Sequence, residues 1–137
     1  MRWNTMHLTI AVAGVICLGM TLPVFAKREA PKPVKPVLLN GIEYRIVHEQ
    51  FEKNGSPAGM RAFVVAQGQA IGKELWKAQL YELTYDLNLE TDIQDVYVIS
   101  LVATDDGLHA TTEKSREFVI DVKQHTVREI GEKRLPE

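Results

Sequence analysis

Turn-forming residues divide the chain after residue 38 into segments that are too short for long helices. The stretch "EKNGSPAG" (52–59), the glycine at Gly72 and the tripeptide "DDG" (105–107) each separate two apolar runs. Within the runs, as in "GIEYRIV" (41–47), apolar and polar residues alternate. A period of two places the apolar side chains on one face of a strand. We therefore predict a mainly β fold, a small antiparallel meander or sandwich of seven to eight short strands.

Two of the apolar runs are almost continuous. "MRAFVVAQG" (60–68) predicts a central strand, and "DVYVISLVAT" (95–104) predicts a strand buried on both faces. The alternation of "YELTYDLNL" (81–89) predicts a strand along its whole length. Further strands are expected at 41–47, 108–113, 117–122 and 126–130.

The segment "KELWKAQL" (73–80) allows two interpretations. Its residues are good helix formers with apolar side chains at i,i+4 spacing, so a short helix is one alternative. No N-cap residue precedes Lys73, and no stop signal separates Leu80 from the alternating run that follows. Gly72 also suits a hairpin turn that needs a left-handed residue. We favour a turn followed by a strand.

The first 26 residues have the features of a secretory signal. Arg2 is followed by an apolar run at 8–22, Pro23 ends that run, and "VFA" ends at Ala26. A membrane-spanning helix needs about 20 apolar residues, which is longer than this run. We expect cleavage after Ala26, a periplasmic or secreted location and no membrane attachment afterwards. An uncleaved anchor is the alternative.

After the signal, "KREAPKPVKPV" (27–37) predicts an extended, basic, Pro-rich linker, and 38–137 a single β domain. The one cysteine, Cys17, precedes the linker, so the remainder has no thiol for a disulfide or a metal site. Loss of Arg2 leaves 15 of the 16 basic residues against all 18 acidic ones. This balance predicts no nucleic-acid partner.

The run "AQGQAIGKELW" resembles the repeat of PQQ-type β-propellers, Ala-x-Asp-x-x-Thr-Gly-x-x-x-Trp. Ala66, Gly72 and Trp76 match the repeat, whereas Gly68 and Ile71 replace its Asp and Thr. The resemblance covers about a third of the chain after residue 26 and implies a blade-like hairpin with Trp76 packed in a core. A propeller needs at least about four blades, more than this chain can supply. No quinone ligand is among the matched residues, so no cofactor is expected.

A second stretch, "EFVIDVKQHTVREI" (117–130), is similar to the final strand, turn and strand of PepSY-type secreted modules. That resemblance implies an inhibitor or chaperone of a secreted hydrolase. Domains of that family begin with a helix, and no helix candidate precedes Gly41.

Candidate chemistry is sparse. His48, His109 and His125 do not have metal-binding spacing, although His109 could pair as a base with Asp105 or Asp106. A metal-dependent or acid–base enzyme using His48 and His109 is therefore an alternative, but we expect no catalytic residue and no enzyme.

An acidic stretch around residue 90 resembles a calcium loop only in part. Its oxygen-bearing residues are Asp86, Asn88, Glu90 and Asp92. The loop glycine and the final glutamate, whose place Tyr97 takes, are missing. We expect no metal site.

The function class predicted is a non-enzymatic protein-binding module. Binding through an exposed sheet edge or an aromatic face around Trp76 is expected, to a partner protein or to a second copy. The candidate binding or structural anchors are Trp76, Tyr81, Tyr85, Tyr97 and Gly72.

Overall fold

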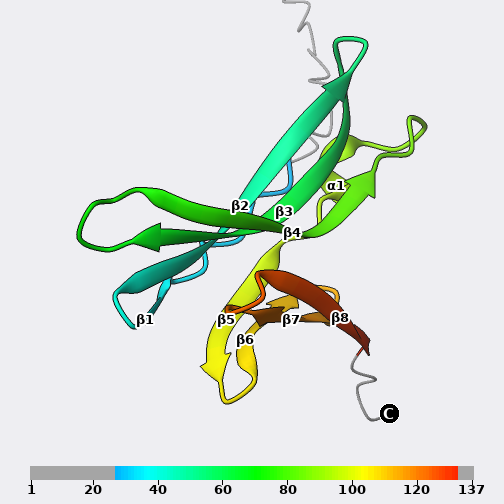
Figure 1. Cartoon of the computed structure of the whole chain (residues 1–137). Coiled ribbons are helices and arrows are strands. Elements are labelled where there is room, and N and C mark those ends of the chain that lie inside the picture. The colour runs from blue at the N-terminus through cyan, green and yellow to red at the C-terminus, as the bar shows by residue number, and fades with distance from the viewer. Residues whose placement is uncertain (1–26, 133–137) are drawn as a thin grey trace, which may run out of the picture.

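The computed structural model describes residues 27–132, which form two four-stranded antiparallel meanders joined by one short helix (Figure 1). The mainly β prediction is confirmed. The N-terminal sheet contains, in spatial order, β1 (Val37–Leu39), β2 (Ile42–Lys53), β3 (Ser56–Gly68) and β4 (Glu74–Thr84). After α1 (Thr91–Gln94), the C-terminal sheet contains β5 (Val98–Thr104), β6 (Gly107–Thr112), β7 (Arg116–Asp121) and β8 (Thr126–Glu132). Among these residues, no helix is long and apolar enough to cross a membrane.

The long hairpin of β2 and β3 is the frame of the N-terminal sheet. Alternation in β2 turns Tyr44 into the core, where it pairs with Ala66 of β3. Asn54 and Gly55, both with positive φ, form the two-residue turn expected of an Asn-Gly pair. The strands have 12 and 13 residues, and the tip of their hairpin projects beyond the C-terminal sheet (Figure 1). As predicted, β3 is an inner strand.

The alternative of a helix over 73–80 is wrong, because residues 74–80 lie in β4. Gly72 has a φ of 63°, and its N–H donates to the carbonyl of Gly68 at 2.8 Å. This tight turn reverses the chain and brings Trp76 opposite Ala66 of β3. Pairing with β3 therefore overrides the helix propensity of the segment.

The strand predicted over 81–89 ends early, at Thr84. The Tyr85 N–H makes a last bond to the carbonyl of Ala58, near the start of β3, and the pairing of β3 with β4 ends there. The chain then continues as a connection of residues 85–97, here called the junction loop. The side-chain amide of Gln94 holds it by donating to the carbonyls of Asp86, Leu89 and Glu90 at 3.0–3.3 Å.

The prediction that 95–104 is a strand buried on both faces is also wrong. β5 begins only at Val98 and is an edge strand. Val98 and Leu101 are buried, but Ile99 and Val102 are 52% and 48% exposed. The N-terminal sheet covers one face of the C-terminal sheet, so the opposite face of β5 remains in solvent.

The inner faces of the two sheets share one hydrophobic core. Phe118 of β7 is its largest fully buried side chain, and its ring lies 5.6 Å from that of Tyr81 on β4. The other core side chains from both sheets include Tyr44, Met60, Val64, Tyr85, Val98, Leu108 and Ile120. Burial of this apolar surface is the main force that holds the sheets together.

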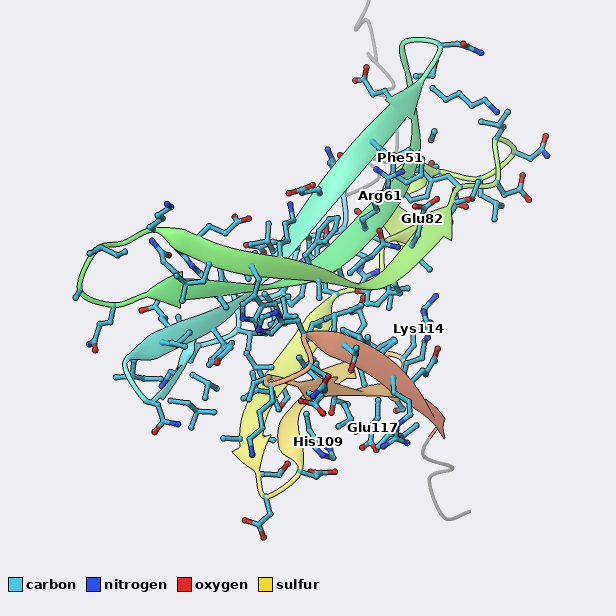
Figure 2. All side chains as sticks on the ribbon, viewed as in Figure 1. Phe51, Arg61, Glu82, His109, Lys114 and Glu117 are labelled. Carbon is cyan, nitrogen blue, oxygen red and sulfur yellow. The ribbon has the colours of Figure 1, made fainter. Side chains whose placement is uncertain are left out.

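The outer face of the N-terminal sheet carries aromatic rings covered by paired charges. The Arg61 guanidinium lies 4.4 Å from the centre of the Phe51 ring and donates to Glu82 at 2.7 Å, and Figure 2 shows these three side chains side by side. Lys77 similarly lies 4.0 Å from the Phe63 ring. These charges therefore contact rings and acids of their own sheet.

Candidate functional site

Three of the predicted anchors converge on the junction loop. The Tyr81 hydroxyl donates to the carbonyl oxygen of Val96, and the Tyr85 hydroxyl donates to the Asp95 carboxylate. The Tyr97 hydroxyl donates to the other Asp95 oxygen at 3.1 Å. These tyrosines therefore fix the connection between the two sheets.

Asp95 is the centre of this arrangement, and the sequence analysis did not single it out. Only 4% of Asp95 is exposed, so its carboxylate needs hydrogen-bond donors. Tyr85 and Tyr97 supply two, and Gln50 adds a long contact at 3.5 Å. Burial, and then the hydrogen bond to Asp95, raise the pKa of both tyrosines, which stay neutral donors near pH 7. The available signal was an acid directly before the apolar run "VYVISLV".

The Pro-rich segment, residues 27–36 and here called the arm, contacts this region through Arg28. The Arg28 guanidinium donates to the Asp95 carbonyl oxygen at 3.0 Å and to the Glu113 carboxylate. The Arg28 backbone N–H donates to Asp92 at 2.9 Å. The arm, expected from the sequence to be a spacer, is thus fastened to the body at its first residues.

Glu113 is held in place independently of the arm. Its carboxylate accepts the backbone N–H of Tyr97 at 3.0 Å, and its own N–H donates to the Tyr97 carbonyl at 3.0 Å. The Tyr97 ring lies 6.0 Å from the Arg28 guanidinium carbon, within the range of a cation–π contact. A fixed carboxylate and an aromatic ring therefore face the same cation.

A pocket of about 290 Å³ lies beneath the arm. The His48 ring meets the Tyr97 ring edge-on, with 5.1 Å between centroids. His48 Nε2 accepts the N–H of Val98 at 3.1 Å, so this nitrogen carries no proton. The lining comprises Ala30, Pro31, Lys32, Pro33 and Val34 of the arm, with Ile46, His48, Tyr97 and Val98 opposite.

This geometry gives an expected pH dependence. Burial lowers the pKa of His48, although the nearby Asp95 and Glu113 carboxylates oppose the shift. A depressed folded-state pKa contributes stability above the unfolded value of about 6.5, and that contribution is lost as the pH falls below it. We expect the melting temperature to fall between about pH 7 and pH 5, and His48→Gln to flatten this fall. Thermal melts at several pH values measure this change. An equal flattening by His109→Gln, in β6 of the other sheet, would contradict the assignment to His48.

Trp76 does not join the tyrosines. It stacks on His125, with centroids 4.5 Å apart and an interplanar angle of 20°, and tilts against Tyr44 at 5.9 Å. His125 belongs to the turn before β8, so Trp76 bridges the two sheets. Trp76 is half-buried, and its faces contact His125 and Tyr44 rather than forming an open aromatic surface.

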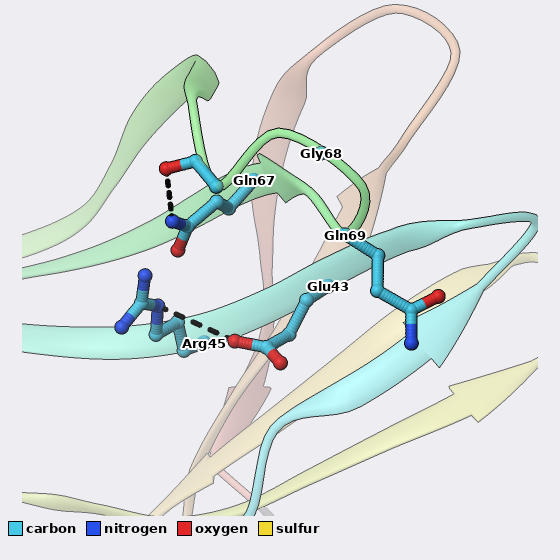
Figure 3. A pocket seen from close by; sticks show the side chains of 6 residues that line it. Glu43, Arg45, Gln67, Gly68 and Gln69 are labelled. Carbon is cyan, nitrogen blue, oxygen red and sulfur yellow. Dashed lines mark hydrogen bonds and ion pairs between the residues drawn. The ribbon is translucent and has the colours of Figure 1, made fainter.

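The remaining predicted anchor, Gly72, lies beside a polar hollow of about 270 Å³ at the β3–β4 turn (Figure 3). Gln67 donates to the Gly72 carbonyl across the turn. Arg45 Nε lies 3.6 Å from a Glu43 oxygen, an ion pair too long for a hydrogen bond. The Gln67 contact spans the turn at Gly72, whereas the Glu43–Arg45 pair lies within β2.

The His109–Asp106 pair considered in the sequence does form. His109 Nε2 lies 2.8 Å from Asp106 Oδ1, which also accepts the Thr104 hydroxyl at 2.6 Å. These two hydrogen bonds lower the pKa of Asp106. His109 lies in β6 of the C-terminal sheet, where Figure 2 labels it, whereas His48 lies in β2 of the N-terminal sheet. Within residues 27–132, no group of three or more His, Asp or Glu side chains is placed to bind a metal ion.

Comparison with models of known families, with curated proteins and with solved structures gives no match. The resemblances to PQQ-type repeats and to PepSY modules therefore remain predictions. The two meanders each have the four strands of a propeller blade, but two such sheets are too few to close a propeller.

Proposed function

We propose that the protein is a non-enzymatic binding module that pairs the free edge of β5 with an extended strand of another protein chain. An edge strand has backbone N–H and C=O groups without a partner strand on one side. An added strand gains affinity by forming main-chain hydrogen bonds with these groups. A second copy of this chain is the first partner to test.

The composition of β5 carries the proposal. Of the four edge strands described between residues 27 and 132, β1 has three residues, and β4 and β8 carry charged side chains. Short length and charge are the usual protections of a sheet edge. β5, "VISLVAT", has seven residues without a charge or a proline, and Ile99 and Val102 are about half exposed.

Export is part of the proposal. The apolar segment at 8–22 and the small residue Ala26 support a cleaved signal. The arm would then begin at Lys27, next to the Arg28 contact. Intact-mass measurement of the exported protein reads the N-terminus directly, and retention of Met1 would contradict cleavage.

Val102→Lys tests the β5 edge, because a lysine there adds the charge that the other edges carry. We expect size-exclusion with light scattering to show concentration-dependent association of the wild type, and Val102→Lys to abolish it. Ile71→Lys, at a 70% exposed position in the β3–β4 turn, is the matched control and should associate normally. Two results together would overturn the proposal. The wild type would be a strict monomer, and a pull-down from periplasmic extract would recover the same proteins with the wild type and with Val102→Lys as bait.

One observation favours the enzyme alternative, the His109–Asp106 pair at 2.8 Å. A carboxylate that orients a histidine is a common element of acid–base catalysis. His109→Ala would have to abolish an activity without changing the melting temperature; unchanged hydrolase activity against model ester and peptide substrates would remove this alternative.

A further inference from the structure

We propose that the surface beneath the arm is a second binding site, which recognises an extended peptide with an arginine followed by prolines, and that the chain's own arm occupies it in cis. This arm site consists of Asp92, Tyr97, Glu113 and the 290 Å³ pocket beneath the arm. It meets the β5 edge only at Val98, the first residue of β5, and it takes a different ligand.

The arginine part of the site has a specific geometry. Glu113 is fixed by two hydrogen bonds to the Tyr97 backbone, so its carboxylate is oriented before a cation arrives. The Arg28 guanidinium bonds this carboxylate through Nη2 and the Asp95 carbonyl through Nη1, near the Tyr97 ring. A planar guanidinium can make all three contacts at once. A lysine ammonium is a compact charge without two nitrogen donors held apart in one plane.

The pocket beneath the arm is the part of the site that would bind the prolines of the peptide. Pro31 and Pro33 line it on the arm side, and Ile46 and the Tyr97 ring line it on the body side. Prolines have no N–H to leave unpaired and favour an extended conformation, so a Pro-rich segment can cross an apolar and aromatic surface without joining a sheet. Proline-rich peptides are commonly recognised by aromatic-lined grooves of this kind.

The arm can be displaced. The side chains of Arg28 and Glu113 are 34% and 21% exposed, and ion pairs open to solvent contribute little to stability. The tether nevertheless gives the arm an effective concentration of about millimolar at the site. A free peptide must compete with it, so the wild-type chain should bind such a peptide weakly.

The test uses the full chain and a labelled peptide with the sequence of residues 27–37, KREAPKPVKPV, followed by fluorescence anisotropy. Arg28→Ala in the chain releases the arm, and we expect it to tighten peptide binding by at least about tenfold. Glu113→Gln in the same background should abolish binding. Glu90→Gln is the control, because Glu90 is an acid of the junction loop whose side chain has no partner among the described residues, and it should leave binding unchanged.

Variants of the peptide separate recognition from simple charge attraction and do not affect folding. Arg28→Gln in the peptide should lose binding, and replacing its prolines by alanine should weaken it at unchanged charge. Equal binding of all these peptides, equal affinity of wild-type and Arg28→Ala chains, or no binding at millimolar peptide would each overturn the proposal. Val102→Lys should leave peptide binding intact. A negative result for strand pairing at β5 can therefore be told apart from a negative result for peptide binding at the arm site.

Discussion

Replacing Phe118 by alanine is expected to lower the free energy of unfolding by about 3–5 kcal/mol. Phe118 is 1% exposed and contacts Tyr81 of the opposite sheet, so the substitution removes apolar burial and leaves a cavity where the sheets meet. Urea unfolding followed by circular dichroism measures the change. The whole protein should still unfold in one transition, because one core serves both sheets.

Phe51→Ala is the matched control, because this ring lies on the outer face beneath Arg61. It should cost less than Phe118→Ala, about 1 kcal/mol for the lost cation–π contact and partial burial. Equal costs for the two substitutions would show that the inner faces of the sheets are not packed together as described.

Gly107→Ala is expected to cost about 3 kcal/mol, the second large effect. Gly107 has a φ of 136°, which side-chain-bearing residues rarely adopt. A Cβ at this position would also lie closer than 3.0 Å to the Ile120 carbonyl oxygen, which is backbone and cannot move aside. The β5–β6 turn and the adjacent β7 strand would both have to shift.

Gly41→Ala separates the two causes. Gly41 also has a positive φ, 75°, but a Cβ there would meet no atom within 4 Å. Its cost should therefore be about 1–2 kcal/mol, the conformational part alone. If thermal and urea unfolding give the same loss for Gly41→Ala and Gly107→Ala, the close approach of Ile120 is not a significant constraint.

Local signals in the sequence predicted the turns and most strands. Asn54–Gly55 and the "DDG" at 105–107 act through their own backbone preferences, which do not depend on distant residues. Gly72 likewise favoured a turn over a helix at 73–80, although the side-chain propensities there indicated the opposite. The mainly β class follows from such local information.

Strand ends and burial depended on partners that the sequence does not specify. The alternation of 81–89 continues past Thr84, but pairing with β3 stops at Gly59, followed only by the bond from the Tyr85 N–H to Ala58. The apolarity of β5 predicted burial, although its place at a sheet edge leaves Ile99 and Val102 exposed.

The candidate site was harder to predict for the same reason. Arg28 lies 64 to 85 positions away from Asp92, Asp95 and Glu113. No spacing rule in the sequence connects residues so distant. In the sequence alone, Asp95 resembles an ordinary acidic residue of a turn, and only the fold brings Tyr85 and Tyr97 into contact with it. Tyr85 and Tyr97 were among the candidates, but Asp95, their common partner, was not.

The stack of Trp76 on His125 provides an optical reporter of sheet docking. The chain has two tryptophans, and the other, Trp3, lies within the predicted signal. In the cleaved protein, the indole emission would come from the one place where β4 meets the turn before β8. Its change during unfolding would time the separation of the two sheets, while circular dichroism follows the strands themselves.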